Sequence, residues 1–532
     1  MRSPSLTATG LLALALAIPT TVAVQAPFNL QYDPLAFAST SSVDPVHFAG
    51  QKVIRFSTEN DAQHKKLLEQ AHALALDVWG AKLGAACGAD SQSAFGCVDI
   101  RMASGTADED PFRALASADE IMAQLMQPFQ ENLRSKTLIE DLDQLLQEQS
   151  RSAEASIQSG GKARDWHKQY HNLEEIEAYM SMLENSYPGH VRVEEIGKTH
   201  EGRSILALKL GQGLPTQPPP SPPQDPQPQP PPPPSNITSL APKTGILITA
   251  GQHAREWIST STSLFFASDL LHAALGPPAN VTTMKKKKSR KGRKKNTWTR
   301  SSALAVLKTF TITIIPVSNP DGYTYSWTKN RMWRKNRQPN KFPSGLFCKG
   351  VDLNRNYGFA FASSALASPC SEMYPGTTPF SSAETTAIGR YLQAEENNVR
   401  AYFDLHSYGQ LMMYPFSYDC SQPVADEEDL LELALGAVSA VKKVHGRQFS
   451  AGKVCAVYAE GGGNSIDWSY ASSEPVPGTE AEKRRVKWSF SVELRDGGTY
   501  GFLLPPKQII PAGEEVSAGL RYMLDFIGKK EH

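Results

Sequence analysis

The chain has 532 residues, several times the roughly 100–200 that one domain usually takes, so its length predicts more than one folding unit. Its 54 basic residues balance its 54 acidic residues, which excludes a global electrostatic field that would favour nucleic acid or an anionic membrane. Hydrophobic residues make up 40% and charged residues 20%, a composition that excludes a disordered chain and allows a sizeable core.

Residues 1–23 have the order of features found in a secretory signal: Arg2, an apolar run at 11–18, and small residues ending at Ala23. We expect cleavage after Ala23; a cut after Ala26 also satisfies the small-residue rule but would leave a proline at the new terminus. The apolar run is shorter than the ~20 residues of a membrane-spanning helix, and no later segment reaches that length. The sequence therefore predicts a secreted or vacuolar protein without a transmembrane segment.

The cysteines are even in number, which in an exported protein favours disulfides over metal thiolates. Six cysteines allow about fifteen pairings, and the sequential pairing is preferred because it closes the shortest loops. Its pairs are Cys87 with Cys97, Cys348 with Cys370, and Cys420 with Cys455. Asn236 and Asn280 open glycosylation sequons, a pattern that is common by chance and gains weight only from the expected export.

A small α+β unit is predicted between residues 46 and 132. Short apolar strands at 53–56 and 76–79 alternate there with helical patterns at 61–74 and 114–126. Strands and helices that alternate over fewer than 100 residues suggest one sheet with two packed helices.

A polar connector follows at 133–164, with helical character around 138–146. Its second half offers basic cleavage sites at Arg151, Lys162 and Arg164. The composition alone fits an ordinary linker equally well.

Residues 165–532 read as one large α/β domain with a mixed sheet and helices on both faces. Helical patterns alternate with apolar runs at 205–210, 245–250, 310–317 and 401–405.

Two low-complexity inserts interrupt this domain. The stretch 215–234 holds 13 of the 38 prolines and should form an extended loop between strands, with an SH3-type ligand as the alternative. The basic run 285–295 is read as a solvated loop, with weak polyanion contact or processing by a basic-site protease as alternatives.

His253 and Glu256 follow directly on the apolar run 245–250, and three-residue spacing puts both side chains on one side of a turn. Such a pattern alone is mostly accidental. A second strand, 401–405, also ends in a histidine, His406, which supplies a third ligand. Three ligands with an open fourth position describe a catalytic zinc site, so the sequence predicts one Zn²⁺ per chain.

The segment His-Ala-Arg-Glu-Trp at 253–257 resembles the zinc motif of the secreted metallocarboxypeptidases of the A/B type. Further segments match that family in the same order, at 319–323, 330–335, 350–356, 406–408, 465–468 and 493–496. The resemblance covers the chain from Trp166 to the C-terminus. It implies that residues 24–164 are a propeptide, which acts as an intramolecular inhibitor.

The resemblance also implies catalytic roles. His253, Glu256 and His406 would bind zinc. Glu493 would be the general base that accepts a proton from water, and Arg334 would stabilise the oxyanion of the tetrahedral intermediate.

Substrate contacts follow in the same way. Asn354 and Arg355 would hold the terminal carboxylate of a peptide or protein substrate. Arg255 and Tyr408 would line the next subsites, and Tyr458 would close over the bound residue.

Ile466 matches the position at the base of the pocket for the C-terminal side chain. An apolar floor predicts release of aromatic and aliphatic residues rather than Lys or Arg. The neighbouring Asp467 should point away from the pocket if this segment is a strand.

The sequence is also similar to the fungal extracellular-matrix branch of the family, whose members are regarded as inactive. That branch typically lacks the general-base Glu and the Asn–Arg pair, whereas this chain has Glu493, Asn354 and Arg355. The leading hypothesis is a secreted zinc exopeptidase made as a zymogen. The alternatives are an inactive zinc-binding protein of cell-wall or vacuolar biogenesis, and an extracellular polyanion-binding protein that uses 285–295.

Overall fold

The computed structural model describes twelve stretches of the chain: 48–74, 76–87, 94–102, 118–129, 133–149, 163–216, 243–278, 298–341, 348–361, 368–458, 461–471 and 486–531. Several sequence predictions lie outside these residues: the signal at 1–23, the sequons at Asn236 and Asn280, the basic run, most of the Pro-rich insert, and Arg151 and Lys162 of the connector.

The N-terminal part forms a four-stranded antiparallel sheet in the order β2-β3-β1-β4. The strands are β1 (Lys52–Thr58), β2 (Asp77–Leu83), β3 (Gly96–Met102) and β4 (Arg134–Ile139). Helices α1 (Asp61–Ala73) and α2 (Ala118–Met126) pack with the sheet around buried Phe56, Leu67, Ile100 and Leu125. This is the expected α+β unit, although β4 lies beyond residue 132. A further helix covers residues 142–149.

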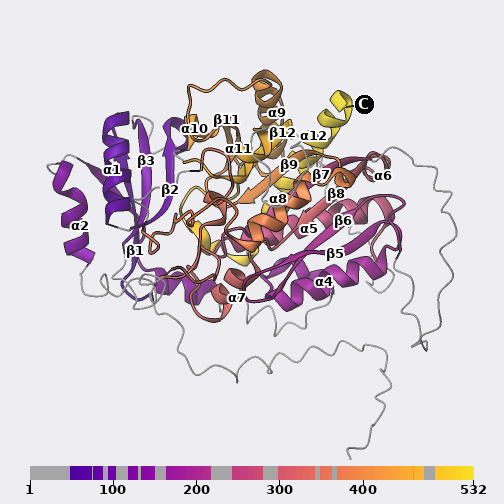
Figure 1. Ribbon diagram of the computed structural model, residues 1–532, viewed down its shortest axis with the longest axis horizontal. Coiled ribbons are helices and arrows are strands. Elements are labelled where there is room, and N and C mark those ends of the chain that lie inside the picture. The colour runs from indigo at the N-terminus through magenta and orange to yellow at the C-terminus, as the bar shows by residue number, and fades with distance from the viewer. Residues whose placement is uncertain are drawn as a thin grey trace, which may run out of the picture. The chain divides into compact units, whose positions relative to one another are not determined.

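The rest of the described chain is organised around an eight-stranded mixed sheet in the order β11-β10-β12-β9-β7-β8-β6-β5 (Figure 1). Its strands are β5 (Val191–Lys198), β6 (Ser204–Leu210), β7 (Thr244–Ala250), β8 (Phe310–Ile315), β9 (Val399–His406), β10 (Leu411–Tyr414), β11 (Ser450–Lys453) and β12 (Trp488–Glu493). The central strands β8, β7, β9 and β12 run parallel.

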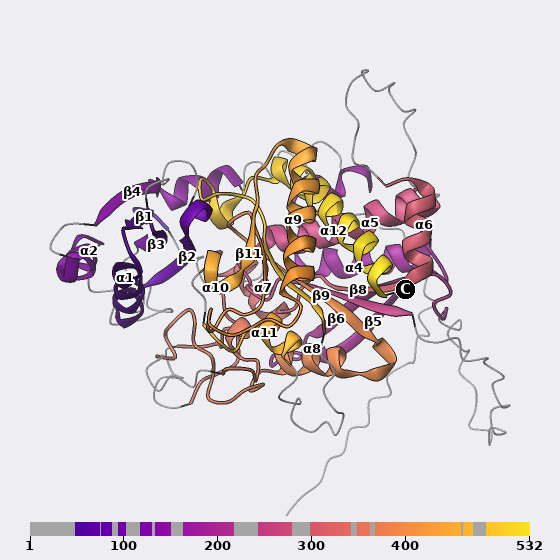
Figure 2. The ribbon, with the colours of Figure 1, turned by 90° about the horizontal axis from the view of Figure 1, so that it is seen from above.

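Helices cover both faces of this sheet. Figure 2 shows α5, α6, α9 and α12 on one side and α8 and α11 on the other. The helices are α4 (Leu173–Ser186), α5 (Trp257–Leu275), α6 (Arg300–Thr309), α7 (Pro320–Thr328), α8 (Ala383–Gln393), α9 (Glu427–His445), α10 (Val454–Val457), α11 (Ser465–Tyr470) and α12 (Ile509–Glu531). Short 3₁₀ turns are η2 (Gly84–Cys87), η5 (Gln127–Phe129), η6 (Ala163–Lys168), η8 (Leu353–Arg355), η9 (Glu395–Asn397), η10 (Gly501–Leu503) and η11 (Pro506–Gln508).

Strand β7 shows why the central strands are continuously apolar. Ile246 and Ile248 join the core cluster that contains α4, α5 and α12, whereas Leu247 joins the cluster that contains α8 and α11. Successive side chains of a strand point to opposite faces, so a strand covered on both faces buries every residue. The predicted α/β architecture is confirmed.

Three disulfides link Cys87–Cys97, Cys348–Cys370 and Cys420–Cys455, the sequential pairing. None of the helices in the described stretches combines the length and hydropathy that a membrane crossing requires.

One buried acid in α8 makes stability depend on pH. Glu384 is fully buried, accepts one hydrogen bond from Asn336 Nδ2 (3.0 Å), and has no partner for Oε1 among the described residues. Burial, together with the nearby charges of Asp321 and Glu201, raises its pKa to about 7. The folded protein therefore binds more protons at this site than the unfolded chain between about pH 4.5 and 7.

The unmodified protein should lose stability as the pH rises through this window, and we expect the Glu384→Gln variant not to show this loss. The stability gain of the variant should grow from pH 5 to pH 8, because only the parent must ionise a buried carboxyl group. Thermal unfolding midpoints of both proteins across this range measure it. Parallel pH profiles for the two proteins would show that Glu384 does not titrate as stated.

Candidate metal and substrate site

Three strands that lie side by side in the sheet end at the same edge. β7 ends at Ala250, β9 ends at His406 and β12 ends at Glu493, with Glu493 opposite His406 in the parallel register. His253 lies in the turn after β7, and Glu256 is the N-cap residue of α5. Because the carboxyl ends of parallel strands meet, residues distant in sequence converge at this edge.

His253, Glu256 and His406 form a buried group in which one ligand atom from each lies within 4.8 Å of the others. His253 Nδ1 lies 2.8 Å from Glu256 Oε1, and His406 Nδ1 lies 3.1 Å from Glu256 Oε2. The two Nδ1 atoms are 3.2 Å apart. Two imidazoles and one carboxylate, all buried, form a donor set that suits a zinc ion with an open position.

A second carboxylate, that of Asp352, contacts the other ring nitrogen of His253. Asp352 Oδ1 lies 3.0 Å from His253 Nε2, and Asp352 Oδ2 accepts from Arg334 Nη2 at 2.8 Å. Arg334 Nη1 also lies 3.9 Å from Glu256 Oε1. Charges of alternating sign therefore meet in a buried site.

These charges shift the pKa values of the acids. Burial alone would raise the pKa of Glu256, but His253 and His406 lower it far below its usual range. Burial would likewise raise the pKa of Asp352, and Arg334 and His253 overcome this and lower it. Both acids are therefore carboxylates at neutral pH.

Asn354 and Arg355 lie in η8, directly after Asp352, whose side chain accepts from the Asn354 backbone N–H at 3.0 Å. Asn354 Oδ1 accepts from the backbone N–H of Ser465 at 2.9 Å, which leaves its amide group on the side of His406. The Arg355 guanidinium donates to the Asn354 carbonyl and contacts the sulfur of Met373.

One cavity joins most of the predicted residues. Its lining includes His253, Glu256, Arg334, Arg355, Tyr458 and Glu493, together with Ser407, Met373 and Phe502. Leu68, His72, Val78, Trp79 and Ala81 of the N-terminal part line it as well. Its volume is about 40 Å³, room for a few water molecules but not for a peptide.

Arg255 and Tyr408 lie outside this lining and contact the N-terminal sheet instead. Arg255 Nη1 lies 2.9 Å from both carboxylate oxygens of Asp77. The Tyr408 hydroxyl donates to Asp99 Oδ2 at 3.1 Å, and its ring meets the edge of Trp79.

Ile466 is buried in an apolar cluster that includes Val454 and Trp468, and does not line the cavity. The expectation that it sits on a strand is wrong: Ser465–Tyr470 is helix α11. Asp467 is held by the backbone N–H and hydroxyl of Ser417, at 2.9 and 2.6 Å from Oδ2. A six-residue apolar segment carries too little periodicity to separate a helical turn from a strand.

Two residues of this site were not identified from the sequence. Asp352 contacts His253 and Asp404 contacts His406, each through the ring nitrogen Nε2. The available signal was an acid inside the otherwise apolar strand 401–405, since a buried carboxylate requires hydrogen-bond donors around it.

Comparisons with known proteins agree with this arrangement. The zinc carboxypeptidase family model, Peptidase_M14, matches residues 176–519. Carboxypeptidase A1 of Mus musculus is 31% identical over 484 residues, which cover 90% of this chain and 94% of that protein. An inactive metallocarboxypeptidase, ecm14 of Sclerotinia sclerotiorum, is 29% identical over 509 residues, 90% of this chain and 73% of that protein.

Among solved structures, thrombin activatable fibrinolysis inhibitor is similar over 90% of this chain and 99% of its own, with a TM-score of 0.61 and 25% identity. The family match spans well over half of the sequence and includes the His-Glu-His group at the sheet edge. This chain belongs to the zinc carboxypeptidase family, which contains both active carboxypeptidases and members named inactive.

Proposed function

We propose that this chain is a secreted zinc exopeptidase, made as a zymogen, that hydrolyses the C-terminal peptide bond of peptides and proteins. The observation that carries the proposal is the position of Glu493, which lies opposite His406 at the sheet edge and lines one cavity with His253, Glu256 and Arg334. A site that only stored zinc would not need a buried carboxylate beside its ligands.

His253, Glu256 and His406 would hold the zinc. When bound, zinc supplies Lewis-acid chemistry: it lowers the pKa of water and polarises a carbonyl group. Glu493 takes the proton from the attacking water and later returns it to the departing amine.

Arg334 stabilises the negative charge that develops on the carbonyl oxygen. Burial works against its charge, but Asp352 and Glu256 raise its pKa above the usual value for arginine. The guanidinium is therefore a permanent cation, fixed by two hydrogen bonds to Asp352 at 3.2 and 2.8 Å. A cation held in place before the reaction needs little reorganisation in the transition state.

Asn354 and Arg355 bind the terminal carboxylate, which limits the reaction to the last peptide bond. Both are buried and lie in one 3₁₀ turn that Asp352 caps. The guanidinium fork of Arg355 suits a carboxylate.

The second candidate function is an inactive zinc-binding protein, which the inactive relative favours. Both candidates bind zinc, so turnover separates them. Zinc-loaded protein that is cut in the connector and still hydrolyses no C-terminal peptide bond would favour the inactive protein.

We expect His253→Ala and His406→Ala to abolish both bound zinc and turnover. Glu493→Gln should keep zinc but lose several orders of magnitude in kcat, because a positioned base is removed while the ligands remain. Metal analysis and hydrolysis of a blocked dipeptide measure the two properties separately. Full activity of Glu493→Gln would refute the assignment of the general base.

The latent state rests on contacts between the N-terminal unit and predicted substrate residues. Asp77 of β2 pairs with Arg255, which is fully buried. Trp79 packs against Tyr408 and Phe502, with ring centroids 6.3 and 4.7 Å apart. Residues that would meet a peptide are thus already in contact with β2.

Strand β2 also reaches the residue that would close over the substrate. Lys82 and Tyr458 form an isolated antiparallel bridge, which extends the free edge of the N-terminal sheet. The side chain of Lys82 is fully buried and lies 4.9 Å from the centre of the Tyr408 ring.

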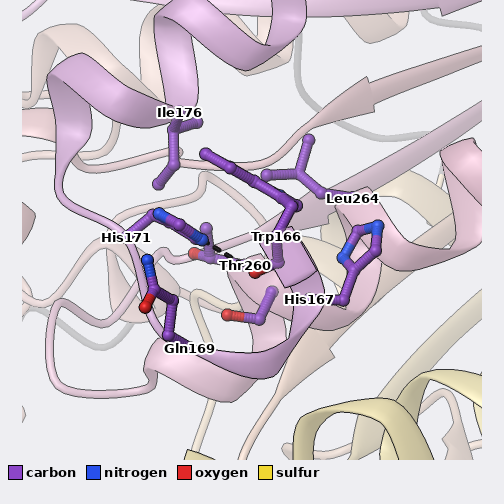
Figure 3. Close-up of a pocket in the computed structure, with 8 residues that line it drawn as sticks. Trp166, His167, Gln169, His171, Ile176, Thr260 and Leu264 are labelled. Carbon is purple, nitrogen blue, oxygen red and sulfur yellow. Dashed lines mark hydrogen bonds between the residues drawn. The ribbon is translucent and has the colours of Figure 1, made fainter. Parts of the chain in front are cut away.

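The chain is fixed again where the connector ends. Trp166 stacks on His171 at 3.4 Å between ring centroids (Figure 3). It also stacks on Tyr179, at 4.2 Å between ring centroids. His171 Nε2 lies 2.8 Å from the Trp166 carbonyl, and His167 Nε2 lies 2.7 Å from the hydroxyl of Ser268. A protease needs an extended segment, so activation should occur upstream of Trp166.

We expect trypsin to raise activity on large peptides by cutting at Arg151 or Lys162, which precede η6 (Ala163–Lys168), and not at Arg164 or Lys168 within it. N-terminal sequencing of the large fragment identifies the cut. An uncut chain that hydrolyses large peptides as fast as the cut chain would refute latency.

Asp77→Asn should activate the uncut chain in part, because it removes the buried carboxylate that pairs with both Arg255 and Arg101, and the loss of one partner from a buried pair costs about 3–5 kcal/mol. Glu140→Gln is the matched control, because it removes an ion pair of the same unit between Glu140 and Lys52. The Glu140 side chain is 76% exposed and the Lys52 side chain 49% exposed. Exposed pairs contribute about 0–1 kcal/mol, so the control should stay latent. Equal activity of both variants would contradict the role of Asp77.

Specificity should favour C-terminal aromatic and aliphatic residues. The surroundings of Ile466 are apolar, and the neighbouring Asp467 carboxylate is engaged by Ser417 rather than by a Lys or Arg side chain of a substrate. Burying a Phe or Leu side chain gains about 2 kcal/mol. Hydrolysis of peptides that differ only in the last residue tests this, and Ile466→Asp should shift the ranking towards Lys and Arg. A parent enzyme that prefers basic residues would overturn the assignment.

A further inference from the structure

Strand β9 carries an acid at a position that the sheet buries completely. Asp404 lies between Phe403 and Leu405, two residues before His406, and has no solvent exposure. An ionised carboxylate in such a place is strongly destabilising unless donors surround it.

Asp404 accepts from four side chains that come from different elements. Thr249 of β7 donates to Oδ1 at 2.7 Å. Gln252, beside His253, and Ser465, at the start of α11, donate to Oδ2 at 2.5 and 2.6 Å. The fourth partner is His406, whose Nε2 lies 2.8 Å from Oδ2.

The last contact fixes the tautomer of His406. A carboxylate can only accept, so the hydrogen of the ring must reside on Nε2. The competing neighbour, Asn354 Nδ2, is a donor and lies farther from Nε2, at 3.3 Å. Because Nε2 is engaged by Asp404, Nδ1, which lies 3.1 Å from Glu256 Oε2 and 3.2 Å from His253 Nδ1, is the ring nitrogen left for a metal ion.

The same geometry occurs on the other histidine. His253 directs Nε2 at Asp352 and Nδ1 at Glu256. The two rings thus approach one point with the same nitrogen, each backed by a buried carboxylate.

We infer that Asp404 is a positioning residue for His406, which holds the ring with Nδ1 as the ligand atom and strengthens its binding of the metal. This inference rests on the proposed zinc site. Asp404 also links that ring to substrate recognition, because Ser465 donates its hydroxyl to Asp404 and its backbone N–H to Asn354. The amide group of Asn354 is then left for the substrate carboxylate.

Zinc release tests the inference. Asp404→Asn keeps the shape of the side chain and removes its charge, so transfer of zinc from the full-length protein to a chelator should become about 10–100-fold more favourable. Glu384→Gln is the matched control, since it makes the same change in a buried acid of α8 that contacts no metal ligand, and it should release zinc like the parent.

Failure of the inference is distinct from failure of the zinc site. A parent that binds no zinc refutes the site and the inference together. A parent and an Asp404→Asn variant with equal zinc affinity refute the inference alone.

Two spectroscopic readouts separate positioning from a merely structural role. Cobalt-substituted Asp404→Asn should show altered visible absorption bands, whereas cobalt-substituted Glu384→Gln should not. In zinc-loaded parent protein, ¹⁵N NMR of the histidine rings should assign the proton of His406 to Nε2, a measurement that needs no folded variant. A His406 proton on Nδ1 would overturn the inference.

Discussion

The parallel course of β7, β9 and β12 is the constraint on which the rest of the site depends. Their carboxyl ends meet at one sheet edge, so the turn after β7 and the last residues of β9 and β12 bring together side chains separated by up to 240 positions in the chain. Loops could not hold such a group alone, since each ligand would have to be ordered separately. The sheet orders them together, because its strands are buried on both faces.

Buried charge is the second constraint, and the site meets it by placing groups of opposite charge next to one another. Arg334, Asp352, His253, Glu256, His406 and Asp404 form a continuous series in which each charged or polar group contacts the next. The two outer carboxylates, Asp352 and Asp404, also accept hydrogen bonds from scaffold groups outside the series. Removal of one member takes a contact from each of its buried neighbours, so substitutions in this series should not behave additively.

The sequence predicts the parts of this arrangement that depend on local pattern. Apolar runs that are followed by His253 and by His406 indicate strand ends, and the alternation of strands and helices indicates a mixed sheet with helices on both faces. Glu493, Arg334 and Asn354 carry no such local signal and were assigned only through family resemblance.

Other features depend on contacts that no spacing encodes. Asp77 and Arg255 are 178 positions apart, and nothing in either segment indicates the other. Strand β4 was not predicted because it is an edge strand with a mostly exposed, polar face. Helix α11 was not predicted because six residues are too few to display a helical period. Asp404 lay in a predicted strand, yet three of its donors come from two distant segments, 249–252 and Ser465.

In the proposed zymogen, latency and substrate recognition would draw on the same side chains, which limits how each could be altered. Arg255 and Tyr408 would line subsites in the cut enzyme and are held by Asp77 and Asp99 in the intact chain. If the proposal holds, a change at Arg255 would affect both inhibition and peptide binding, whereas a change at Asp77 would affect inhibition alone. On the proposed function, latency could thus be tuned through β2 without loss of catalysis, because β2 would leave the site once the N-terminal unit is removed.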